Sequence, residues 1–170
     1  MVVYAAMTFT PGQSPPTPRG DLFIWPGVGG DIDLFQVVFL TSDNCSAPQG
    51  SWCVHPYVAG PQHINGPVTV AGSNDKIRIE YELQPDGVHW IQSATNLATG
   101  EVITQLESDS GNYQNGADRT YVGWEVRLDK PDTSFQDTFG VIRGATFEGV
   151  TMEQNGQVWK IEKIFIPKMS

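Results

Sequence analysis

Positive charge, cysteine and long apolar runs are all scarce in this 170-residue sequence. Ten lysine and arginine residues stand against 19 aspartate and glutamate residues, so the formal net charge is −9. This negative field argues against nucleic acid or an anionic membrane as a partner. No stretch is apolar enough to span a bilayer. The first residues, MVVYAAMTFTPG, lack the basic and apolar regions of a signal peptide.

Helical periodicity is also missing, whereas period-two alternation is frequent. In KIRIEYELQ, residues 76–84, the apolar side chains fall on every second position, as expected for a half-buried strand. Glycine and proline, at 18 and 12 residues, supply the turns that many short strands require. The other predicted strands span residues 2–10, 21–25, 34–41, 51–58, 67–71, 88–96, 101–107, 120–128, 139–153 with a break near Gly144, and 157–166. We therefore predict one all-β domain, residues 1–170, folded as a two-sheet antiparallel β-sandwich of the jelly-roll, concanavalin-like type.

The two cysteines, Cys45 and Cys53, bracket a proline–glycine turn in CSAPQGSWC. Such a turn can bring the two Cα atoms within bridging distance, so we predict a disulfide, with two unlinked thiols as the alternative. Asn44 begins an Asn-Cys-Ser sequence, which matches the N-glycosylation pattern. Both features favour a secreted protein or one in the secretory pathway.

Candidate metal ligands are present but poorly spaced. The three histidines have no ligand-like spacing, and the acidic loop at residues 108–119 does not fit the EF-hand calcium loop. No landmark identifies a serine nucleophile either. We expect neither a metal nor a cofactor.

Gln36 is the most informative polar residue, because it lies at the centre of the otherwise apolar strand LFQVVF. An unpaired buried amide costs about 1–3 kcal/mol, so either another group of the protein or a ligand must bind this side chain.

The strand TYVGWEVRL, residues 120–128, carries a second polar set. Its apolar side chains alternate with Tyr121, Gly123, Glu125 and Arg127, which share the opposite face. One interpretation is an exposed Glu125–Arg127 ion pair that contributes less than about 1 kcal/mol. The other is that Tyr121, Gly123 and Glu125 form the floor of a groove.

Taken together, these segments resemble the glutamic peptidases, or eqolisins, which are fungal acid endopeptidases. The resemblance rests on WPGVGGD followed five residues later by Gln36, on Trp52 in SWCVHPY, and on DRTYVGWEV, and it extends from about residue 4 to residue 128. It implies a two-sheet β-sandwich and a reaction in which a carboxylate activates water while the Gln36 amide binds the oxyanion.

The sequence departs from the family pattern at the carboxylates. Gly123 occupies the position of the catalytic glutamate, and the two other acidic positions become Gly29 and Val54. Glu125 faces the same way as Gly123 but lies two residues further along the strand.

Our leading hypothesis is therefore a peptidase-like cleft repurposed to bind a small apolar or aromatic molecule. Binding alone and a non-hydrolytic reaction such as a cyclisation are both compatible with the sequence. The ligand-binding residues of this hypothesis, besides Gln36, are Trp25, Trp52, Tyr121, Gly123 and Arg127. One alternative is an acid peptidase that acts on a peptide through Gln36 and Glu125. Another is a carbohydrate-binding, lectin-like module.

Overall fold

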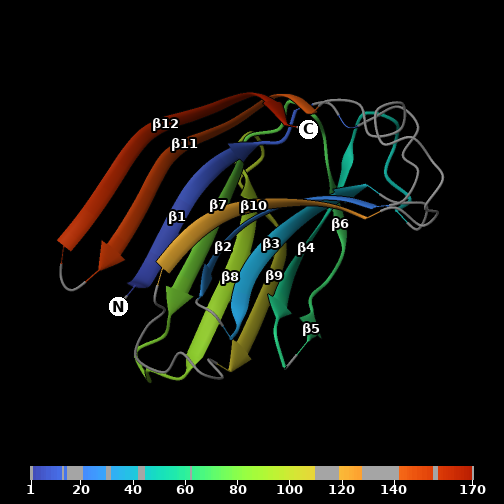
Figure 1. Cartoon of the computed structure of the whole chain (residues 1–170). Helices are drawn as coiled ribbons and strands as arrows, with labels where there is room; N and C mark the ends of the chain where they lie inside the picture. Colours follow the sequence, from blue (N-terminus) through green and yellow to red (C-terminus); the bar gives the residue numbers. More distant parts are fainter. Residues whose placement is uncertain are drawn as a thin grey trace.

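The computed structural model is built from antiparallel strands (Figure 1). It describes residues 2–12, 14, 21–29, 32–41, 45–61, 63–109, 119–127, 142–154 and 157–169, with the backbone alone at residues 21–22 and after residue 109. The strands are β1 Val2–Thr10, β2 Asp21–Gly29, β3 Leu34–Thr41, β4 Trp52–Ala59, β5 Ile64–Asn65, β6 Thr69–Ala71, β7 Ile77–Leu83, β8 His89–Asn96, β9 Glu101–Asp109, β10 Arg119–Arg127, β11 Ile142–Gln154 and β12 Gln157–Met169.

These strands form two sheets. Sheet A has the order β12-β11-β1-β7-β8-β9, and sheet B has the order β10-β2-β3-β4-β5 with β6 paired to β4. The predicted all-β sandwich is confirmed, and each predicted strand is present with boundaries shifted by at most a few residues. The predicted break near Gly144 is wrong, because β11 is one strand that pairs with β12 in a constant register. The short strand β5 was not predicted, because two residues are too few to show alternation.

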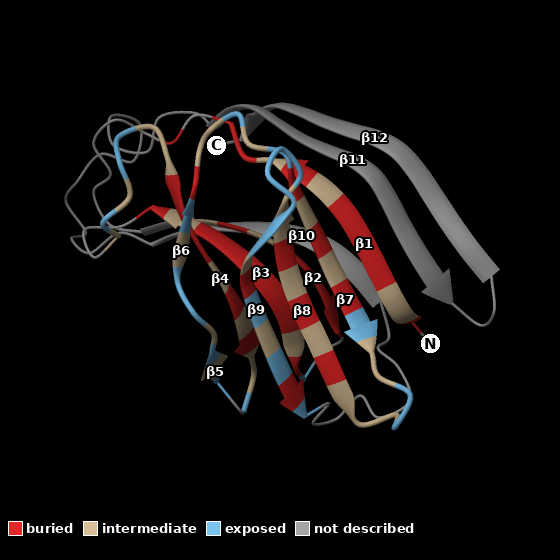
Figure 2. Ribbon diagram, turned by 180° about the vertical axis from the view of Figure 1, so that it is seen from behind, coloured by how far each residue is buried: buried red, intermediate tan, exposed pale blue. Residues whose placement is uncertain are grey.

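The hydrophobic core lies between the two sheets. The alternation predicted in β7 is confirmed, since Ile77, Ile79 and Tyr81 are fully buried, and Figure 2 shows buried and less buried residues alternating along β7 and β8. Aromatic pairs join the layers: Phe9 of β1 meets Phe39 of β3 edge-on at 4.7 Å between ring centroids. Such burial of apolar area is the main stabilising term of the fold.

Tyr81 also makes a polar connection across the core. The paired residues of β2 and β3 are interrupted at Pro26, which has no backbone N–H to donate. At this gap the Tyr81 hydroxyl accepts a hydrogen bond from the Val37 N–H at 2.8 Å and donates one to the Pro26 carbonyl at 2.5 Å. A side chain of sheet A therefore satisfies backbone groups of sheet B beside the strand position of Gln36.

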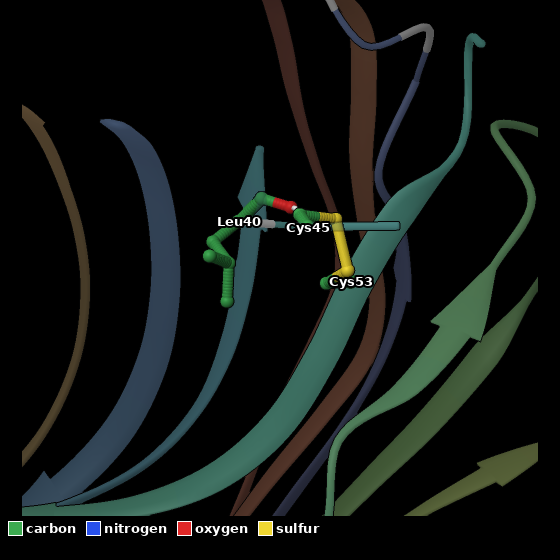
Figure 3. The surroundings of a disulfide bond; sticks show 3 residues. All are labelled: Leu40, Cys45 and Cys53. Atoms are coloured by element: carbon green, nitrogen blue, oxygen red, sulfur yellow. Dashed lines mark hydrogen bonds between the residues drawn. A yellow bond between two sulfur atoms is a disulfide. The ribbon is translucent and has the colours of Figure 1, made fainter. Parts of the chain in front are cut away.

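The predicted disulfide is confirmed. Cys45 and Cys53 are bonded with a Cα–Cα distance of 6.0 Å, and Cys45 Sγ lies 3.8 Å from the Leu40 carbonyl oxygen (Figure 3). The bond ties the segment that follows β3 to the start of β4. Asn44, the predicted glycosylation site, lies outside the described residues.

Candidate functional site

Strand register places the candidate residues in rows across the outer face of sheet B, the face turned away from sheet A. Gln36 pairs with Gly27 of β2 on one side and with Tyr57 of β4 on the other, and Tyr57 pairs with Asn65 of β5. Directly paired residues of antiparallel strands lie on one face. Val38 and His55 pair in the neighbouring row.

A pocket of about 380 Å³ opens on this outer face. Its lining combines apolar and aromatic groups with a few polar ones, drawn from Phe23, Trp25, Leu34, Gln36, Val38, His55, Tyr57, Ala59, His63 and Asn65. Gln36 and Val38 are buried at 6% and 4% exposure, whereas His63 and Asn65 are exposed. We name this feature the outer-face pocket.

Gln36 is held in the wall of the outer-face pocket. Its Oε1 is buried and has no hydrogen-bond partner among the described residues. Gly27 opposite it has to be glycine, because a Cβ there would lie 2.6 Å from the Phe35 carbonyl oxygen and 3.3 Å from Gln36 Cβ. The strand pair is thus closely packed beneath an amide whose oxygen has no hydrogen-bond partner among the described residues.

Two imidazoles flank the Tyr57 ring in the pocket. His55 and His63 have ring centroids 6.1 Å and 6.3 Å from that of Tyr57, and the Tyr57 hydroxyl lies 2.7 Å from His63 Nδ1. His55 Nδ1 is buried without a hydrogen-bond partner among the described residues. Burial lowers the pKa of His55 below its usual 6.5, and the Pro56 backbone acts weakly in the opposite direction. His55 is therefore neutral at pH 7.

These histidines and Tyr57 were not among the residues selected from the sequence. No described group of three or more His, Cys, Asp or Glu side chains is placed to hold a metal. The signal that was available is the alternation of Cys53, His55 and Tyr57 along β4, which puts all three on one face.

The other predicted site residues divide between the core, the pocket and β10. Trp25 lines the pocket. Trp52 does not: it is fully buried in the core, and its indole N–H donates to the Gly12 carbonyl at 2.8 Å. The expectation for Trp52 is corrected accordingly, because its even-numbered position on β4 belongs to the core face.

Strand β10 brings the remaining predicted positions beside β2. Its residues Tyr121, Gly123, Glu125 and Arg127 pair in register with Gly27, Trp25, Phe23 and Asp21, respectively. The β10 positions therefore continue the rows of the outer face, with Tyr121 in the row of Gln36 and Glu125 four residues further along the strand, in the row of Phe23 and Leu40. The side chains of these four residues lie outside the described part of the structure.

Within the described ranges, no helix is long and apolar enough to cross a membrane.

The fold is a two-sheet β-sandwich with a pocket on the outer face of one sheet. No protein-family model matches the sequence, and no curated protein sequence matches it. Among solved structures, the chain is similar to scytalido-glutamic peptidase with a peptide-based transition-state analogue, at a TM-score of 0.61 and 11% identity over 99% of this chain and 83% of that one. It is also similar to SCP-B, a member of the eqolisin family of peptidases, in complex with the tripeptide Ala-Ile-His, at a TM-score of 0.54 and 12% identity over 99% of this chain and 82% of that one. The resemblance noted in the sequence is thus confirmed at the level of the fold.

Proposed function

We propose that the outer-face pocket binds a small, neutral aromatic molecule that carries a hydrogen-bond donor. The observation that carries this proposal is the buried Gln36 Oε1, which has no described partner and lies in the wall of the pocket. A buried carbonyl acceptor left without a donor is unfavourable by about 1–3 kcal/mol, and a donor on the ligand removes that penalty.

The lining supports an aromatic ligand. Phe23, Trp25 and Tyr57 provide flat apolar surface, and Leu34 and Val38 add aliphatic surface. A volume of about 380 Å³ is at the small end of the range for small-molecule sites, about 300–1,000 Å³. Aromatic side chains pack well against a flat ligand, while a few polar groups set its orientation.

The same lining favours a neutral ligand over peptide hydrolysis. No aspartate or glutamate is among the described residues that line the pocket. The solved relatives are peptidases, and one of them holds a tripeptide, so acid peptidase activity is the alternative to be tested. It would require Glu125, whose strand position pairs with Phe23. Without a carboxylate, nothing in the described lining activates water at acid pH in the way of that family.

The direct test compares two flat probes that differ only in whether their oxygen carries a hydrogen or a methyl group. Calorimetry should show that 2-naphthol binds more tightly than 2-methoxynaphthalene, by about tenfold for one hydrogen bond. Gln36→Leu should remove this preference and leave weak binding of both probes. Gln92→Leu is the matched control, because Gln92 is also a buried strand amide without a described partner and does not line the pocket. Equal affinity of the two probes for the unmodified protein would refute the proposal.

A parallel assay tests the peptidase alternative. Denatured casein is incubated with the protein at about pH 3–4, where acid peptidases act. We expect no cleavage. Cleavage that is lost in both Gln36→Ala and Glu125→Gln would establish the alternative and overturn the repurposed pocket.

We further propose that the protein is secreted or folds in the secretory pathway. The Cys45–Cys53 disulfide supports this, because structural disulfides persist in oxidising compartments.

A further inference from the structure

The outer-face pocket contains a hydrogen-bonded pair with acid–base capacity. The Tyr57 hydroxyl and His63 Nδ1 are 2.7 Å apart, and both residues line the pocket. A phenol and an imidazole at this distance can exchange a proton without moving. A pair of this kind at the rim of a ligand pocket is suited to more than binding.

The backbone holds His63 in a specific conformation. His63 has a φ of 46°, and it is the only residue other than glycine with a positive φ in the described part of the chain. Left-handed backbone is unfavourable for most residues with a side chain. It occurs here in the connection between β4 and β5, where it brings the imidazole next to Tyr57.

Two further neutral groups, Gln36 and His55, lie beside Tyr57 in the outer-face pocket. Gln36 is directly paired with Tyr57, and its uncharged amide lines the same pocket. His55 adds a neutral imidazole on the other side of the Tyr57 ring. A neutral imidazole can donate one hydrogen bond, and such a donor favours negative charge that develops on a bound molecule.

We propose that Tyr57 and His63 act together as a general base on a carbon acid or phenol bound in the outer-face pocket. This inference rests on the proposed function, since it requires that the pocket bind a small aromatic molecule. Tyr57 would be the catalytic residue that touches the ligand, and His63 would accept the proton that Tyr57 releases.

The proton step is written for a defined probe, 5-nitro-1,2-benzisoxazole. The C3 hydrogen of the probe moves to Tyr57 Oη while the Tyr57 hydroxyl proton moves to His63 Nδ1. The electron pair of the broken C–H bond completes a carbon–nitrogen triple bond, the nitrogen–oxygen bond breaks, and the oxygen leaves as a coloured nitrophenolate. The net charge is conserved, because one phenolate and one imidazolium form. No external oxidant or co-reactant is needed.

The test measures release of the nitrophenolate at neutral pH. We expect catalysis with a primary isotope effect when C3 carries deuterium. Positioned general bases contribute about 10²–10⁴-fold, so Tyr57→Phe and His63→Gln should each lower kcat by at least about 100-fold while KM changes little. His89→Gln is the matched control, because His89 is an exposed histidine that pairs with Asp86 and does not line the pocket.

The outcomes separate this inference from the proposed function. If 2-naphthol binds but the probe is not converted faster than in buffer, the base function is wrong and the binding function stands. Conversion that persists in both Tyr57→Phe and His63→Gln, with circular dichroism confirming that the variants are folded, also overturns the inference. If neither 2-naphthol nor the probe binds, both proposals fail.

Discussion

Replacing Gln36 by leucine should increase the free energy of unfolding and weaken the ligand at the same time. Replacing a residue that only supports the fold lowers the free energy of unfolding of the protein. Gln36 differs, because its Oε1 is buried and lacks a described hydrogen-bond partner while the residue itself lines the pocket. The buried amide therefore destabilises the free protein and strengthens the binding of the ligand.

The magnitude follows from the burial of the amide. Removing an unsatisfied buried acceptor relieves about 1–3 kcal/mol, and a leucine of similar length keeps the packing of the 6%-exposed side chain. We expect a gain of about 1–2 kcal/mol after some loss from imperfect fit. For a chain of 170 residues, each kcal/mol raises Tm by about 2–4 °C. Loss of one hydrogen bond to the ligand lowers affinity by about tenfold.

Urea denaturation followed by tryptophan fluorescence measures the first effect, and calorimetry with 2-naphthol measures the second. Gln92→Leu separates the two, since it should raise stability in the same way and leave affinity unchanged. If Gln36→Leu lowers the free energy of unfolding by about 2 kcal/mol or more, the amide is a satisfied structural group and the reasoning fails.

Four further changes test other parts of the structure. Tyr81→Phe removes the hydroxyl that bridges β2 and β3, so urea denaturation should show a loss of about 2–4 kcal/mol, and a loss below about 0.5 kcal/mol would mean that the strands re-pair without it. The double variant Cys45→Ser/Cys53→Ser removes the cross-link that closes a short loop, so its free energy of unfolding should be lower by about 2.5 kcal/mol. An unchanged midpoint of urea denaturation would show that the loop closes without the disulfide. Burial depresses the pKa of His55, so the free energy of unfolding has its full value above pH 6.5 and falls as the pH decreases toward the folded-state pKa. His55→Gln should flatten this part of the plot of unfolding free energy against pH. An unaltered slope would contradict the burial of His55. Gly60→Ala places a Cβ at a φ of +128° and against the backbone that precedes β3, so thermal melting should show a loss of about 1–3 kcal/mol, and an unchanged Tm would refute that contact.

Local pattern was sufficient for much of the fold. Alternation along KIRIEYELQ correctly predicted which side chains of β7 enter the core, because successive strand residues point to opposite faces whatever their partners are. The short cysteine spacing was sufficient for the disulfide for a similar reason, since a turn within one segment brings the two residues together. The resemblance to glutamic peptidases rested on such local segments as well.

The site was only partly accessible from the sequence. Gln36 was identified because a lone amide in an apolar strand conflicts with its neighbours. Trp52 was assigned to the wrong face, because an aromatic residue at the start of a strand is equally compatible with a core and with a pocket wall. Tyr57 and His63 were missed, because neither belongs to a motif that can be read along the chain.

The sequence by itself determined the strand character of the chain, its turns and the odd position of Gln36. Only the tertiary structure decided that Gln36, Tyr57 and Asn65 lie in one row and that His63 reaches the Tyr57 hydroxyl. The physical reason is that alternation is a property of one strand, whereas register is set between strands. Which residues meet across β3, β4 and β5 depends on how both sheets pack their apolar faces together, and that packing involves residues far apart in the chain.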